Sequence, residues 1–80
     1  MTTIIGIKLT NRTETSAEFQ TVISRYGCTI KTRIGLHSTC HSVCANFGII
    51  LLEVLDDNQA LQLKKDLTEL DGTIVNSMTL

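Results

Sequence analysis

The sequence predicts an α+β fold, a ferredoxin-like βαββαβ sandwich in which one four-stranded antiparallel sheet carries two helices on one face. Six periodic segments follow one another in the order strand, helix, strand, strand, helix, strand. The fourth of them, Phe47–Leu55, is almost continuously apolar, as a central strand is. Eighty residues form one small domain, so this fold is expected to span residues 1–80.

The first half of the chain holds a strand, a helix and a second strand. Thr3–Leu9 and Cys28–Leu36 both alternate with a period of two, which is typical of strands with two different faces. The alternation places Cys28 toward the core with Ile30, as a small buried hydrophobe. One face of the intervening helix repeats at helical spacing through Phe19, Val22, Ile23 and Tyr26.

The second half repeats this plan. Phe47–Leu55 is predicted to be central and covered on both faces, whereas Cys28–Leu36, with one polar face, is predicted to be an edge strand. The second helix has an apolar face at helical spacing, made of Ala60, Leu63, Leu67 and Leu70. Thr73–Leu80, rich in β-branched residues, is the last strand.

Both helices carry recognisable boundary residues. Asn11 or, as an alternative, Thr15 is expected to cap the start of the first helix, and Asp56 the second. Glycines at the helix ends, Gly27 and Gly72, are expected to adopt the left-handed conformation that closes a helix.

Two helices cover only one face of such a sheet. The residues expected on the helix side are Ile5, Ile7, Leu9, Ile30, Ile34, Ile50, Leu52 and Val54. The residues expected on the other face are Ile4, Ile49 and Leu51, beside Lys8, Lys31, Arg33 and Glu53. Exposed aliphatic side chains within a charged rim indicate an interaction surface. Because small cores are often stabilised by assembly, a homo-oligomer, dimer or tetramer, is expected.

Composition excludes several classes of function. Seven basic and eight acidic residues give a net charge of −1, without the basic footprint of a nucleic-acid-binding protein. The longest apolar run, Phe47–Leu52, is far shorter than the roughly 20 residues that cross a membrane. No basic and apolar leader pattern is visible, and three cysteines do not suit a secreted disulfide scaffold. A cytoplasmic location is therefore expected.

Two histidines and two cysteines gather in the connection after the third segment. His37, Cys40, His41 and Cys44 combine imidazole and thiolate ligands, which suit zinc and, less clearly, copper or nickel. Four ligands in eight residues close a tetrahedron with difficulty, so a site completed by a second copy is easier to build. Two alternatives stay open, a polar loop with free thiols and a redox pair formed by Cys40 and Cys44.

No catalytic arrangement is visible in the sequence. A cysteine–histidine nucleophile needs a third, orienting group, and none is identifiable. No glycine-rich phosphate loop follows a strand. The sequence therefore predicts a protein without enzymatic activity.

Four short motifs resemble those of the bacterial iron-only hydrogenase system regulators. They are Arg25-Tyr26-Gly27, Thr32-Arg33-Ile34-Gly35-Leu36, Gly48-Ile49-Ile50-Leu51-Leu52 and Asp71-Gly72. That family is similar in fold to ACT domains and to the C-terminal domain of nickel-responsive repressors. The resemblance implies an oligomeric regulatory or ligand-binding module that senses a metal or a small metabolite and acts through an effector or a protein partner. The chain departs from the family in the longer, His/Cys-containing connection after Leu36. A purely structural assembly module remains an alternative.

Overall fold

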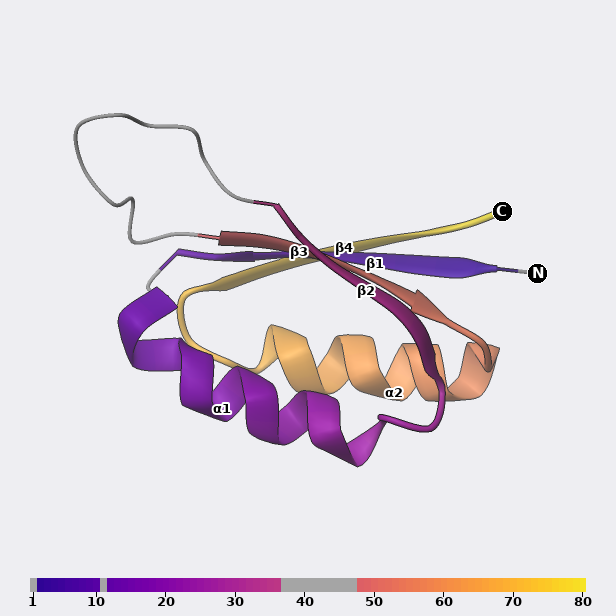
Figure 1. The fold of residues 1–80 in the computed structure, drawn as a ribbon, viewed down its shortest axis with the longest axis horizontal. Coiled ribbons are helices and arrows are strands. Elements are labelled where there is room, and N and C mark those ends of the chain that lie inside the picture. Colours follow the sequence, from indigo (N-terminus) through magenta and orange to yellow (C-terminus); the bar gives the residue numbers. More distant parts are fainter. Residues whose placement is uncertain (1, 11, 37–47) are drawn as a thin grey trace.

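The computed structural model describes residues 2–10, 12–36 and 48–80, with the side chains of residues 12–16 left aside. Six elements follow one another along the chain (Figure 1). They are β1 (Thr3–Leu9), α1 (Arg12–Arg25), β2 (Ile30–Leu36), β3 (Gly48–Val54), α2 (Asp57–Thr68) and β4 (Thr73–Thr79). The predicted ferredoxin-like α+β fold is confirmed.

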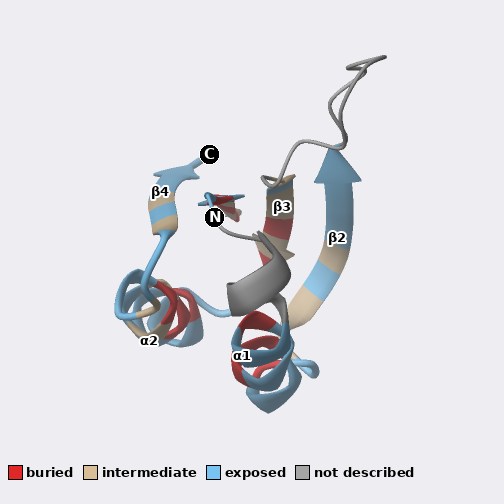
Figure 2. Cartoon of the chain, turned by 90° about the vertical axis from the view of Figure 1, so that its left-hand side faces the viewer, coloured by how far each residue is buried: buried red, intermediate tan, exposed pale blue. Residues whose placement is uncertain are grey.

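The four strands form one antiparallel sheet in the order β2-β3-β1-β4. The first and third strands are therefore central, and β2 is an edge strand, as the sequence predicts. Both helices lie against the same face, and the other face of the sheet carries no described element (Figure 1). The end-on view places α2 below β4 (Figure 2). None of the described helices is long and apolar enough to cross a membrane.

The core lies between the helices and the sheet. Its buried residues are Ile5, Ile7, Leu9, Phe19, Val22, Ile23, Tyr26, Leu52, Val54, Ala60, Leu63 and Leu67. The buried segments of both helices, red in Figure 2, lie on the sides that are turned toward the sheet and toward the other helix. The predicted apolar faces of both helices are thus confirmed, with Leu70 only partly buried against the core.

One of the predicted helix boundaries is confirmed, and the predicted conformation of one glycine is observed at a different place. Asp56 caps α2, because its carboxylate accepts a hydrogen bond from the backbone N–H of Gln59 at 3.0 Å. Gly72 is left-handed as predicted, with φ of 74°, but it lies in the turn directly before β4 and does not close α2, which ends at Thr68 with Glu69 as its C-cap.

The other predicted boundaries either differ in the structure or fall outside the described residues. Thr15 lies inside α1 and is not its cap, and Asn11 is outside the described residues. Gly27 is not left-handed, since among the described residues only Gly72 has a positive φ. The Tyr26 carbonyl instead accepts hydrogen bonds from the N–H groups of Thr29 and Ile30, at 2.9 and 3.2 Å, so α1 ends in a turn without a left-handed residue.

A β-bulge in β2 reverses the predicted faces of that strand. Ile30 pairs with Val54 and Thr32 with Glu53, so two steps along β2 match one along β3 and Lys31 is the extra residue. Beyond the bulge, Arg33 lies opposite buried Leu52. The predictions that Ile34 faces the helices and Arg33 the open side are therefore wrong. An unbroken alternation cannot reveal an inserted residue.

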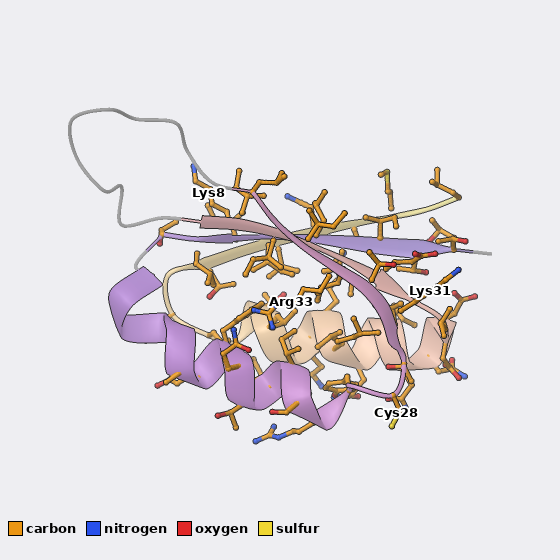
Figure 3. The ribbon with its side chains drawn as sticks, viewed as in Figure 1. Lys8, Cys28, Lys31 and Arg33 are labelled. Carbon is orange, nitrogen blue, oxygen red and sulfur yellow. The ribbon has the colours of Figure 1, made fainter. Side chains whose placement is uncertain are left out.

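Side-chain contacts confirm this reversal. The Arg33 Nη1 atom donates a hydrogen bond to Gln20 Oε1 at 3.0 Å, and the guanidinium lies 5.7 Å from the ring centre of Phe19. Figure 3 shows Arg33 between the sheet and α1, while Lys8 projects from the opposite face of the sheet. Arg33 therefore covers part of the core beside α1 with its long stem.

Two further expectations about burial are corrected. Cys28 is an exposed free cysteine in the turn after α1, because β2 begins only at Ile30 (Figure 3). The central strand β3 is covered on one face only: Leu52 and Val54 are buried, whereas Ile49 is exposed and Leu51 half-buried. The continuous apolar run signals a second apolar face, which no described part of the chain covers.

Candidate functional site

The uncovered face of the sheet carries a grid of side chains that the strand register fixes. Each row of this open face runs across the strands in the order β2, β3, β1, β4. The first row is Thr32, Glu53, Ile4 and Met78; the second is Ile34, Leu51, Gly6 and Asn76; the third is Leu36, Ile49, Lys8 and Ile74. Seven of these twelve positions hold aliphatic or methionine side chains.

Many of these apolar side chains remain accessible to solvent. Ile34, Leu36, Ile74 and Met78 expose between 47% and 56% of their surface, and Ile49 exposes 37%. At the centre, a Cβ atom added to Gly6 would lie 3.6 Å from Leu51 Cδ2, so Leu51 leans over the glycine. The open face therefore leaves several large apolar side chains in solvent, a feature of interaction sites.

The described part of the open face contains one anion and one cation. Glu53 accepts a hydrogen bond from Thr32 Oγ1 at 3.0 Å in the first row. Lys8 projects from the third row, on the neighbouring central strand (Figure 3). The face is thus apolar at its centre and balanced in charge.

A small cavity lies beside this sheet, between α2 and β4. Its volume is about 250 Å³, and its polar lining comes from Thr3, Asp57, Lys64, Ser77 and Thr79. Thr3 Oγ1 donates a hydrogen bond to Asp57 Oδ1 at 3.1 Å, and Lys64 Nζ donates one to Ser77 Oγ at 3.0 Å. The apolar part of the lining is Ala60 and Leu61. A carboxylate, an ammonium group and hydroxyls thus meet an apolar wall.

A second hollow lies between the two helices and is rich in carboxylates. Glu18, Asp66 and Glu69 line it together with Arg25. Beside it, the Tyr26 hydroxyl donates a hydrogen bond of 2.5 Å to Asp66 Oδ2. This bond, with a second one donated by Gln62, holds the pKa of Asp66 below its usual value, although burial opposes the shift. The same bond, desolvation and the negative charge of Asp66 raise the pKa of Tyr26. The pair joins the end of α1 to α2, so we assign it a structural role.

The predicted metal ligands His37, Cys40, His41 and Cys44 lie outside the described residues. Within residues 2–10, 12–36 and 48–80, no group of three or more His, Cys, Asp or Glu residues could hold a metal ion. The metal site therefore stays a prediction of the sequence, as does the alternative redox pair of Cys40 and Cys44.

Sequence reasoning missed more than half of the apolar residues on the open face. Ile34 was expected on the other side, and Leu36, Ile74 and Met78 were not assigned to a face. The sequence does show the two alternating faces of β4. One face consists of Ile74, Asn76 and Met78, and the other of Thr73, Val75, Ser77 and Thr79. Both sets are of mixed polarity, however, so only the pairing of β4 with β1 shows which set faces the helices.

Comparisons with known proteins show the fold and no closer relationship. No protein-family model and no curated protein matches the chain. An uncharacterised protein from Thermotoga maritima is similar in structure, with a TM-score of 0.82 and 20% sequence identity over 99% of this chain and 95% of that one. The ACT domain of a GTP pyrophosphokinase from Chlorobium tepidum gives a TM-score of 0.71 at 16% identity, over 98% of this chain and 97% of the domain.

A third similar structure is a dimeric ferredoxin-like protein of unknown function from Thermobifida fusca. It gives a TM-score of 0.51 at 9% identity, over 99% of this chain and 92% of that one. At such identities the likeness shows that the chain has an ACT-like, ferredoxin-like fold.

Proposed function

We propose that the chain is a small regulatory domain without catalytic activity, which works as a homo-oligomer and binds a small metabolite or a metal ion. The open face is the observation that carries the proposal. A domain of this size has a marginal core, and the face leaves Ile34, Leu36 and Ile49 partly in water. Covering it with a second copy would add roughly 1.5–3 kcal/mol for each aliphatic side chain that becomes fully buried.

A second copy is a suitable occupant for chemical reasons. The face carries one cation and one anion at opposite ends of neighbouring strands, so two copies meet without net repulsion. Two-fold symmetry brings the same apolar centre, around Leu51, onto itself. The dimeric state of the ferredoxin-like protein from Thermobifida fusca supports such an assembly.

Sedimentation of the full chain tests the open face. We expect association at tens of micromolar, and we expect the Ile49→Lys variant to lose a contact because it buries an ammonium group in an apolar interface. The matched control, Asn58→Lys, adds the same charge at an exposed position of α2. If the mass of the Ile49→Lys variant equals that of the wild type, the open face is not the contact.

The cavity between α2 and β4 is the proposed site for a small metabolite. Lys64 and Asp57 offer opposite charges beside the apolar side chain of Leu61, which favours a ligand that carries both polar and apolar groups. The likeness to an ACT domain supports a ligand-binding role. We expect Lys64→Met to weaken binding of metabolites that stabilise the wild type in a thermal-shift screen of small zwitterions and carboxylates. If no metabolite in the screen stabilises the wild type, the metabolite-binding role is wrong and assembly alone remains as the proposed role.

The finer hypothesis, regulation of an iron-only hydrogenase system, rests on the four sequence motifs alone. It predicts a protein partner through which the domain would act. Affinity capture from hydrogenase-producing cells tests this hypothesis. The wild-type bait is compared with the Ile49→Lys variant, in which the open face is altered. The redox or catalytic alternative predicts a turnover that both Cys40→Ser and Cys44→Ser abolish.

A further inference from the structure

We infer that the outer edge of β4 is a second assembly site, where two copies join their sheets through antiparallel β4–β4 pairing. This inference goes beyond the open-face contact, because it concerns backbone groups in the plane of the sheet. The two edges of the sheet differ in a way that selects β4.

The β2 edge carries features that oppose pairing. It is interrupted by the bulge at Lys31, and its residues include the basic pair Lys31 and Arg33. Bulges and charged side chains are common devices by which edge strands avoid pairing with other chains.

The β4 edge has none of these features. Its register with β1 is regular from Thr73 to Thr79, and no charged residue or proline occurs between Thr73 and Leu80. No described strand lies beyond it in the sheet. A regular, uncharged edge of this kind is a template for another strand.

The hydrogen bonds at both ends of β4 show which backbone groups face outward. Leu80 exchanges two hydrogen bonds with Thr2, at 2.8 and 3.0 Å, and Gly72 accepts one from Thr10 at 2.7 Å. Because hydrogen-bonded pairs alternate along antiparallel strands, Ile74, Asn76 and Met78 also point their backbone groups toward β1. The N–H and C=O groups that point outward are those of Thr73, Val75, Ser77 and Thr79.

One register engages all four of these outward residues. With a two-fold axis at Asn76, Thr73 pairs with Thr79 of the partner subunit and Val75 pairs with Ser77 of the partner subunit. Each of these pairs exchanges both backbone hydrogen bonds. Any shift along the strand leaves some of these groups unpaired.

The side chains fit the same register. On the open face, Ile74 lies beside Met78 of the partner subunit, and Asn76 lies beside the partner's Asn76. Two carboxamides on a two-fold axis are self-complementary, since each offers a donor and an acceptor. Directly opposite side chains at such a position have Cβ atoms roughly 4.5–5.5 Å apart, close enough for this contact.

Edge pairing also covers apolar surface on the helix side. Leu61 exposes 70% of its surface and lines the cavity next to Ser77 and Thr79, so it lies on the flank of α2 nearest β4. The paired sheets would extend over this flank and make the proposed metabolite site part of the interface. The open faces of the two copies would also become one continuous surface.

Charge reversal at the axis tests the proposal. We expect Asn76→Lys alone and Asn76→Asp alone to raise the dissociation constant of the edge contact about tenfold or more, because like charges then lie directly opposite. An equimolar mixture of the two variants should form heterodimers at least as well as the wild type. Asn76 is exposed and lies opposite Gly6, so neither change disturbs the core, and circular dichroism checks the fold.

Amide hydrogen exchange gives a second, independent measurement. In the assembled wild type, the outward amides of Val75 and Ser77 should exchange slowly, and in the Asn76→Lys variant they should exchange quickly. Wild-type mass in both charge variants, or a mixture that fails to form heterodimers, would overturn the inference. The open-face contact fails separately, when Ile49→Lys keeps the wild-type mass.

Discussion

At the scale of single residues, the contact between Tyr26 and Asp66 joins α1 to α2 beside the core. Tyr26→Phe removes this hydrogen bond while keeping the ring, so we expect a loss of about 1–2 kcal/mol in the free energy of unfolding at pH 7. Urea titration measures it. Gln62→Leu removes only the weaker 3.2 Å bond to the other Asp66 oxygen and serves as the control. An unchanged midpoint in Tyr26→Phe would mean that the bond contributes nothing net.

The same contact should show a defined pH dependence. The pKa of Asp66 is lower in the folded than in the unfolded state, so its contribution to stability is present above 3.8 and disappears as the pH falls through the folded value. The pKa of Tyr26 is raised, so its contribution is present below 10.0 and disappears as the pH rises through the folded value. The stability difference between wild type and Tyr26→Phe should therefore be constant between pH 5 and 9, roughly, and shrink outside that window. If the stability difference between the wild type and Tyr26→Phe stays constant from acid to alkaline pH, the predicted pH dependence is wrong.

The metal site predicted at the histidines and cysteines of residues 37–44 can be tested separately, and this prediction rests on the sequence alone. If they bind zinc, the ion should raise the melting temperature by mass action, and His37→Ala combined with His41→Ala should abolish the rise. The Cys28→Ser variant is the control, since Cys28 is an exposed thiol in the turn after α1. A melting temperature that ignores excess zinc would favour the polar loop with free thiols.

At the scale of elements, the bulge in β2 and the simple alternation of the sequence lead to opposite predictions for the stability cost of Ile34→Ala. Simple alternation assigns Ile34 to the core, where truncation to alanine costs about 2–5 kcal/mol. The structure exposes 47% of Ile34, so we expect Ile34→Ala to cost less than about 1 kcal/mol in dilute solution and to weaken association instead. Leu52→Ala, at the fully buried position opposite Arg33, should cost the larger amount. Equal losses in both variants would place Ile34 in the core after all.

At the scale of the whole molecule, the open face and the β4 edge are independent contacts, so the assembly should be hierarchical. We expect Ser77→Pro, which removes an outward N–H group of β4 and adds no charge to the open face, to leave a dimer joined by the open face, and we expect Ile49→Lys to leave a dimer joined at the edge. The double variant should be a monomer, and the wild type should be larger than a dimer. Analytical ultracentrifugation over a concentration series measures this, with Asn58→Lys as the charge control. A double variant with the wild-type mass would exclude both contacts.

Most of the fold is determined locally by the sequence. The helical spacing of Phe19, Val22, Ile23 and Tyr26, and that of Ala60, Leu63 and Leu67, identifies the helix faces that are buried. Asp56 marks the start of α2 because its carboxylate caps a neighbouring backbone N–H, and Gly72 marks the turn before β4 because glycine readily adopts a left-handed conformation. Such features depend on residues a few positions apart in the chain, so they can be recognised from the sequence alone.

The tertiary structure alone decides which side chains share the open face and which edge is available. Lys31 becomes the extra residue of a bulge only through the pairing of β2 with β3, and one inserted residue moves Arg33 to the helix side and Ile34 to the open side. The mixed polarity of β4 likewise has no defined face until its register with β1 places Asn76 opposite Gly6. Strand register joins residues far apart in the chain, and hydrogen bonds between backbone groups, which are the same in every residue, leave little trace of it in the sequence.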